Sequence, residues 1–182
     1  MPSLSKSVTD AFKASTTTLK IAFPTTNVTT LGQKVEKQDA QSAPTLFLKS
    51  PTPSKSYLTI SLDPDAPFPS FAFLGPILHG IQTDLVPEGD PDAEGYVKLT
   101  SSVKDVAEWT APAPPKISGP HRYVFLTWEQ PEGVSDKTVR ELLHWKEGEK
   151  VGLGKRVRWN EEDFEQRVGL KDVVASGWFV CG

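Results

Sequence analysis

The chain has little of what marks secreted, membrane or nucleic-acid-binding proteins. Its single cysteine, Cys181, cannot form a disulfide within the chain, so no disulfide-stabilised fold is indicated. No stretch approaches the roughly 18 apolar residues that span a bilayer, and the first residues lack the apolar run of a signal peptide. The 20 basic residues do not outnumber the 23 acidic ones, which argues against direct contact with nucleic acid. We expect a cytoplasmic protein without a transmembrane segment.

Motifs of common catalytic and metal sites are missing as well. The sequence contains no G-x-S-x-G nucleophile elbow, no G-x-x-x-x-G-K-[ST] phosphate loop and no G-x-G-x-x-G dinucleotide fingerprint. It also has no close His-x-His or His-x-x-x-His pair that favours a metal ion. The sequence therefore predicts neither a metal nor a cofactor.

Proline-rich turns separate short segments of β-forming residues. Strands are expected at 19–23, 45–49, 57–62, 78–85, 122–128 and 173–180, and the alternation within 57–62 suggests one buried face. Short helices are expected at 7–15, 136–145 and 161–168, with Ser7, Ser135 and Asn160 as N-caps. Because no βαβ rhythm is present, we predict one mostly β domain over residues 1–182. Its expected form is a large antiparallel β-sandwich with a few peripheral short helices.

The segment Asp63-Pro64-Asp65-Ala66-Pro67 directly follows a predicted strand. Each proline fixes its own φ and keeps the preceding residue out of the helical region. If the strand geometry continues, the two carboxylates project from the same face. They are either a structural network at the end of a strand or part of a site, and the residues alone leave both open.

His79 and His121 each begin a strand-like run after a turn that contains proline or glycine. A lone histidine in a strand is usually a hydrogen-bonded core residue, but adjacent strands can bring two together at one sheet edge. A carboxylate that accepts one imidazole N–H leaves the other ring nitrogen for a ligand such as phosphate or carboxylate. The same set resembles a two-His, one-carboxylate metal site, which the spacing does not support.

The stretch Ala111-Pro112-Ala113-Pro114-Pro115 predicts a stiff loop. The non-proline members of such a loop can present backbone N–H groups to an anion. The plainer interpretation is a rigid crossover between strands.

Taken together, these motifs resemble the phosphatidylethanolamine-binding protein family, in particular its fungal-type members. The family pattern is D-P-D-A-P after a strand, a histidine about a dozen residues later, a G-P-x-P-P loop and then G-x-H-R-Y-V-F. The chain matches it at 63–67, at His79, at 111–115 with Ala111 in place of glycine, and at 121–125. A weaker likeness continues through Arg156 and Asn160.

The resemblance implies a β-sandwich with a small pocket for phosphate-like anions. The pocket residues that carry over are Asp63, Ala66, Pro67, His79, Ala111, Ala113, Pro114, His121 and Tyr123. Asp65 belongs to the same group, and its expected role is a supporting ion pair with Arg122. A carboxylate beside a histidine is expected to raise the pKa of the imidazole, so anion binding is expected to strengthen below a pH of about 6.5.

Family members bind phospholipid head groups, inhibit serine proteases, modulate kinases or co-regulate transcription in plants. Our leading hypothesis is a binding protein with an anion pocket and, in addition, a protein partner such as a protease, a kinase or a pathway enzyme. The alternative is an accessory or catalytic protein in fungal polyketide biosynthesis, where anhydrides dimerise or cyclise. His79, His121 or Asp63 is then the candidate general acid or base. Gly80 stands where the family usually has an aromatic residue. Unless neighbouring residues fill the space, this predicts a wider or differently shaped pocket, and it slightly favours this alternative.

Overall fold

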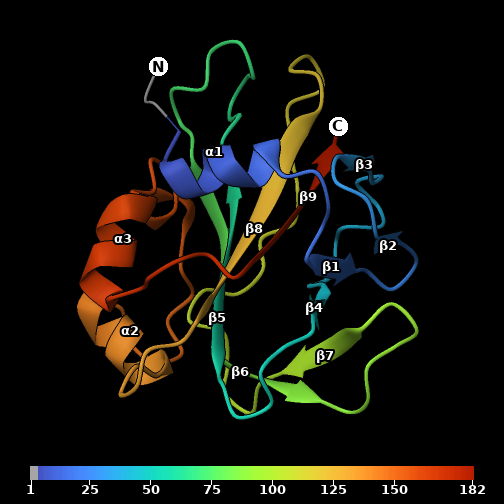
Figure 1. The fold of residues 1–182 in the computed structure, drawn as a ribbon. Coiled ribbons are helices and arrows are strands. Elements are labelled where there is room, and N and C mark those ends of the chain that lie inside the picture. Colours follow the sequence, from blue (N-terminus) through green and yellow to red (C-terminus); the bar gives the residue numbers. More distant parts are fainter. Residues whose placement is uncertain (1–3) are drawn as a thin grey trace.

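The computed structural model describes residues 4–182, and residues 1–3 of the predicted domain lie outside this range. The described residues form nine strands, three α-helices and one short 3-10 helix (Figure 1). The strands are β1 (Leu19–Ala22), β2 (Asn27–Val28), β3 (Gln33–Lys34), β4 (Thr45–Lys49), β5 (Tyr57–Asp63), β6 (Ile77–Glu88), β7 (Tyr96–Thr100), β8 (His121–Glu129) and β9 (Ala175–Cys181). The helices are α1 (Lys6–Lys13), α2 (Asp136–Leu143) and α3 (Glu161–Val168), with the 3-10 turn at Leu153–Lys155.

The strands form one sheet in the order β2-β1-β4-β7-β6-β5-β8-β9-β3. The long strand β6 joins its two halves, because its first part pairs with β5 while Val86 to Glu88 pair with β7. The sheet is not closed, and its halves face each other across a shared core. All pairings are antiparallel except that of β3 with β9. The predicted mostly β sandwich with peripheral short helices is confirmed.

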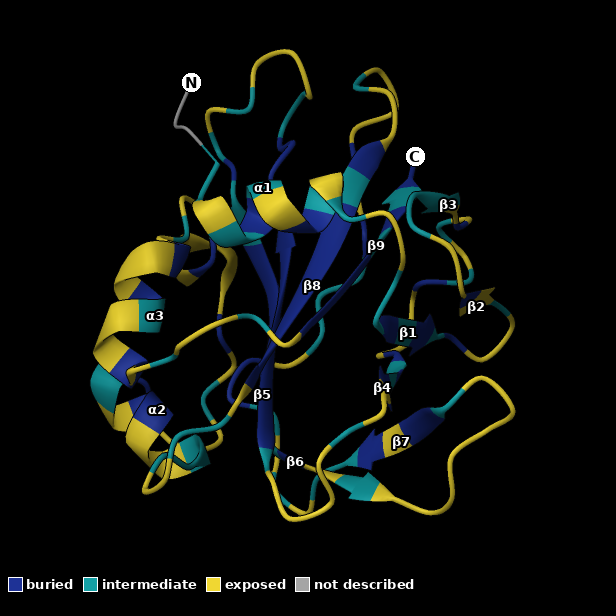
Figure 2. Ribbon diagram, viewed as in Figure 1, coloured by how far each residue is buried: buried dark blue, intermediate teal, exposed yellow. Residues whose placement is uncertain are grey.

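Two layers of apolar packing cover the central strands. One lies between the halves of the sheet and includes Leu19, Tyr123 and Phe179. The other lies between the outer face of the sheet and the three helices, and it includes Ile60 and Trp128. Strands β5 and β8 are therefore dark along almost their whole length in Figure 2, whereas the helices turn an exposed face outward.

Strand β5 shows where the sequence pattern was misleading. Its seven residues are all buried, so the prediction of a single buried face is wrong. Leu58, Ile60 and Leu62 point to the helices. The alternate positions, Thr59 and Ser61, are covered by the facing half of the sheet, which a pattern of alternating polarity does not reveal.

Local capping chemistry explains where the helices start. Ser135 and Thr138 form a capping box at α2, and Asn160 accepts the backbone N–H of Asp163 at α3, as predicted. The expected cap of the first helix is wrong. Ser5 accepts the N–H of Val8, and Ser7 instead donates to Glu165 of α3. Within residues 4–182, no helix is long and apolar enough to cross a bilayer.

Gly177 of β9 allows β1 to pack directly on β9. A Cβ at this position would lie 2.4 Å from the carbonyl oxygen of Leu19 and 3.2 Å from Oγ1 of Thr17. We expect Gly177→Ala to lower the free energy of unfolding by roughly 1–3 kcal/mol, the usual cost of overpacking. Gly152→Ala is the matched control because nothing lies within 4 Å of its Cβ position. Equal urea midpoints for the two variants would show that β1 and β9 are not in close contact.

Candidate functional site

The candidate site begins where β5 ends and β8 starts. These strands are antiparallel neighbours, so Asp63 and His121 meet at the same edge. Asp63 Oδ2 lies 2.8 Å from His121 Nδ1, and its Oδ1 accepts the backbone N–H of Asp65 at 2.8 Å. Both side chains are buried. Because the carboxylate accepts the Nδ1–H group, the other ring nitrogen, Nε2, is left for a further partner.

Asp65 forms the ion pair expected for it. Its Oδ1 accepts from Arg122 Nη2 at 2.6 Å, and its Oδ2 accepts from Arg122 Nε and from the Arg122 backbone N–H at 2.9 Å each. This bond to Asp65 is the main cause that raises the pKa of Arg122. The guanidinium also lies 4.4 Å from the centre of the Phe12 ring on α1.

The two carboxylates therefore face different sides of the sheet. His121 and Arg122 are consecutive residues of β8, so their side chains point to opposite faces. Asp63 contacts His121 and Asp65 contacts Arg122, so the two carboxylates are divided in the same way. The expectation that both carboxylates project from one face fails because β5 ends at Asp63 and the chain turns. Only Asp63 lies with the histidines.

His79 reaches the same place from β6. Its Nδ1 donates to the carbonyl oxygen of Thr110 at 2.5 Å, and its ring meets the Tyr123 ring edge-on with 5.0 Å between centroids. Burial lowers the pKa of His79, outweighing the Thr110 carbonyl and the charge of Asp63, which both act to raise it. The expected net rise in the pKa is therefore wrong for His79: Asp63 acts to raise it, but burial outweighs that effect, and His79 stays neutral at pH 7.

Two polar atoms of the site are buried and have no hydrogen-bond partner among residues 4–182. They are Nε2 of His121 and the hydroxyl oxygen of Tyr123. Both side chains are 1% exposed, and they occupy alternate positions on the same face of β8. Burial, followed by the charge of Asp63, raises the pKa of Tyr123, so the phenol keeps its proton and remains a donor. A buried polar atom without a partner costs about 1–3 kcal/mol, which a ligand can recover.

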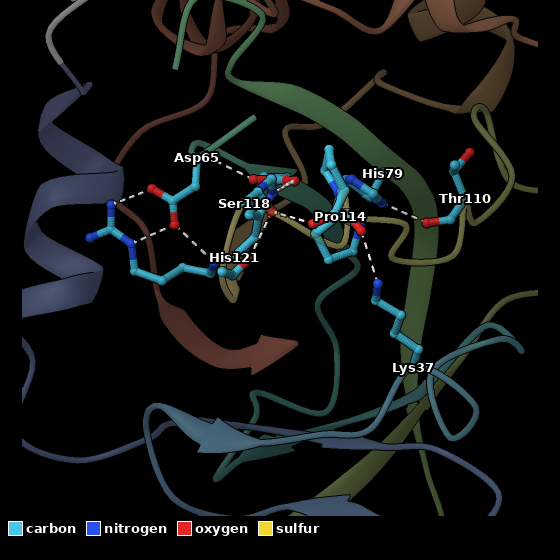
Figure 3. Close-up of polar contacts among 11 residues, drawn as sticks. Lys37, Asp65, His79, Thr110, Pro114, Ser118 and His121 are labelled. Atoms are coloured by element: carbon cyan, nitrogen blue, oxygen red, sulfur yellow. Dashed lines mark hydrogen bonds and ion pairs between the residues drawn. The ribbon is translucent and has the colours of Figure 1, made fainter. Parts of the chain in front are cut away.

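The proline loop runs along this site. Pro114 is buried, and its carbonyl oxygen accepts from Lys37 Nζ at 2.8 Å, which fastens the loop (Figure 3). Ala111 is half-buried, whereas Ala113 is exposed. Ala66 is buried, and its carbonyl oxygen accepts the N–H groups of Leu74 and Gly75, which shapes the loop after β5. Pro67 is half-buried at the start of that loop.

Trp109 is a site residue that the sequence analysis did not identify. Its ring stacks on Phe125 at 5.7 Å and lies 5.8 Å from the His79 ring. A Cβ on Gly80 would meet Ser61 Oγ at 3.2 Å and Trp109 Cα at 4.0 Å, and the cavity beside Gly80 holds only about 10 Å³. Neighbouring residues, Trp109 among them, therefore fill the space beside Gly80, and the pocket is not widened there.

Arg156 is a second residue whose role was missed. Its buried guanidinium donates to the carbonyl oxygens of Leu78, His79 and Glu108 at 3.1, 3.2 and 2.8 Å. It thus joins the strand that carries His79 to the segment that carries Trp109 and Thr110. Its contact was not predictable, because Arg156 lies far along the chain from both segments.

The described residues contain no cluster of metal-binding side chains. Across residues 4–182, no group of three or more histidine, cysteine, aspartate or glutamate side chains is close enough to hold a metal ion.

Comparison with known proteins shows which family the chain belongs to. The family model described as phosphatidylethanolamine-binding protein matches residues 18–165. The chain belongs to the phosphatidylethanolamine-binding protein family. The resemblance to fungal-type members is confirmed by the carboxypeptidase Y inhibitor of Saccharomyces cerevisiae, which is 30% identical over 155 residues. That match covers 79% of this chain and 67% of the inhibitor, and the chain spans about two thirds of a second yeast relative.

Solved structures agree on the fold. The crystal structure of carboxypeptidase Y inhibitor complexed with its cognate proteinase matches with a TM-score of 0.68 and 23% identity, covering 90% of this chain and 81% of the inhibitor chain. A phosphatidylethanolamine-binding protein from Plasmodium vivax matches with a TM-score of 0.64 and 16% identity, covering 90% of this chain and 83% of the other.

The lowered pKa of His79 predicts how pH affects stability. In the unfolded chain an imidazole titrates near 6.5, whereas the folded protein resists its protonation, so the unfolded state binds more protons just below that pH. The stability contributed by neutral His79 is present above pH 6.5 and is lost as pH falls. We expect urea unfolding to show a larger loss between pH 7 and pH 5 for the wild type than for His79→Asn, which cannot be protonated. Parallel losses in the two proteins would contradict this account.

Proposed function

We propose that this protein binds a small phosphate-like anion at Asp63, His79, His121 and Tyr123. The observation that carries the proposal is the pair of buried, unpartnered atoms, His121 Nε2 and the Tyr123 hydroxyl. Membership of the family supports the same conclusion.

The proton arrangement favours a ligand that can both donate and accept hydrogen bonds. Tyr123 offers an O–H group, while His121 Nε2 can accept a hydrogen bond from the ligand because its Nδ1–H is held by Asp63. A phosphate monoanion has both an O–H group and charged oxygens. The less charged form of the ligand, which lower pH favours, is the easier one to bury beside the Asp63 carboxylate, so binding is expected to strengthen as pH falls.

A ligand reaches these atoms only if a neighbouring segment moves, because the four side chains are at most 5% exposed. The loop of residues 113–120 is mostly exposed, and Lys37 holds it at Pro114. We expect this loop to open when ligand enters.

Calorimetric titration with inorganic phosphate tests the proposal. We expect tighter binding at pH 6 than at pH 8, and His121→Ala to weaken binding by roughly 1–3 kcal/mol, the range for a lost charge-assisted hydrogen bond. Tyr123→Phe removes only the hydroxyl and is expected to have a smaller effect. His144→Ala, at an exposed histidine, is the matched control and is expected to bind like the wild type. Absence of binding at millimolar phosphate, or unchanged binding by His121→Ala, would rule out the anion site.

We propose protease inhibition as a second function, because a yeast carboxypeptidase Y inhibitor is 30% identical over most of this chain. In an assay of peptide hydrolysis by yeast carboxypeptidase Y, we expect inhibition to saturate near one equivalent of protein. His121→Ala is expected to inhibit equally well, because its ring is buried and cannot contact a protein partner in the closed structure. No inhibition at a tenfold molar excess would remove this proposal.

Catalysis on an anhydride by His79, His121 or Asp63 stays a prediction of the sequence. Turnover of such a substrate that is lost in His121→Ala would support it over simple binding.

A further inference from the structure

A separate groove lies beside the loop that follows β5. It has a volume of about 660 Å³ and lies between that loop, the start of α1 and the start of α3. Its lining includes Phe71, Phe73, Pro76, Arg158, Trp159 and Glu161, and none of these belongs to the proposed anion site. Figure 1 shows α3 and the first turn of α1 on the same side of the sheet. The volume falls within the roughly 300–1,000 Å³ of small-molecule sites.

Aromatic side chains form one wall of this groove. Phe71 and Phe73 are 61% and 43% exposed, and their ring centroids lie 5.2 Å apart. Two exposed phenylalanine rings side by side offer an apolar surface that a ligand can cover. Aromatic faces attract cations as well as apolar groups.

A buried carboxyl group also lines the groove, and a ligand reaches it only if neighbouring side chains move. Glu161 is 3% exposed, its Oε2 accepts from the Ser5 hydroxyl, and its Oε1 has no partner among residues 4–182. Burial raises the pKa of Glu161 to about 8, and the nearby Glu165 carboxylate adds to the rise. Without a ligand, this group therefore holds a proton at neutral pH.

We propose that the groove binds a small organic ammonium ion, with its N–H groups on Glu161 and its apolar part on Phe71 and Phe73. Charge supports a cation, since the exposed Glu162 also lines the groove beside Glu161. Arg158 is the opposing charge. It is exposed, and its Nε donates to the carbonyl oxygen of Phe73 at 3.2 Å. Solvent screens such an exposed charge more than a buried one.

Proton release follows from this arrangement. The groups around Glu161 are the Ser5 and Ser7 hydroxyls at the start of α1, Glu162 and Glu165 on α3, and Arg158 before it. An ammonium ion favours the ionised carboxylate, so binding at pH 7 displaces the proton of Glu161. The ionised fraction of Glu161 grows as pH rises towards 8, so affinity is expected to increase from pH 6 to pH 8.

Calorimetry with 2-phenylethylammonium in two buffers of different ionisation enthalpy measures both the affinity and the number of protons released. We expect release of up to one proton per ligand at pH 7 and at least tenfold tighter binding than of 2-phenylethanol, which has the same shape without the charge. Glu161→Gln is expected to abolish proton release and to weaken binding at least tenfold. Glu162→Gln, the exposed neighbour, is expected to bind within twofold of the wild type, and Arg158→Gln to bind more tightly.

Several results would overturn the proposal. One is the absence of binding at millimolar 2-phenylethylammonium, and another is that Glu161→Gln binds this ion as tightly as the wild type does. A third is that 3-phenylpropanoate binds more tightly than 2-phenylethylammonium and that this binding is lost in Arg158→Gln. The Glu161→Gln variant keeps an acceptor for Ser5, and an unchanged urea midpoint shows that it folds. His121→Ala is expected to leave this binding unchanged, which separates the groove from the anion site.

Discussion

Asp63 is buried at the end of β5, and both of its oxygens are engaged. Oδ2 lies 2.8 Å from His121 at the start of β8, and Oδ1 accepts the backbone N–H of Asp65 in the turn that follows. A buried carboxylate is costly unless its charge and lone pairs are met, so this pair of contacts fixes the turn, the edge of the sheet and the tautomer of His121 together. The polar side of the site depends on this one side chain.

Alternate side chains along β8 point to opposite faces of the sheet and have different roles. His121 and Tyr123 point between the two halves of the sheet, where Trp109 and Phe125 pack. Arg122 points to the opposite face, where Asp65 and the Phe12 ring hold it. The same strand thus carries a ligand-facing pair on one side and an ion pair that anchors α1 on the other. Arg156 completes the support by linking the strand of His79 to the segment before Thr110.

The sequence allowed the family, the sandwich and the grouping of Asp63 with the two histidines to be predicted, because these depend on local motifs in a fixed order. The caps at Ser135 and Asn160 were predictable for the same reason. Contacts between segments that lie far apart in the sequence could not be predicted. Ser5 rather than Ser7 caps α1 because α3 supplies a carboxylate to Ser7. Trp109 fills the space that Gly80 leaves, and burial outweighs the charge of Asp63, so the pKa of His79 is lowered.

The central claim is that His121 presents Nε2 to an anion while Asp63 holds Nδ1. The chain has three histidines, at 79, 121 and 144, so the ring nitrogens can be followed individually by ¹⁵N NMR after histidine-selective labelling. During titration with inorganic phosphate, the account predicts a large change in the Nε2 resonance of His121, with its Nδ1 remaining protonated. The resonances of the exposed His144 are expected to stay in place. Shifts at His144 alone, or a protonated Nε2 with a bare Nδ1 at His121, would contradict the account.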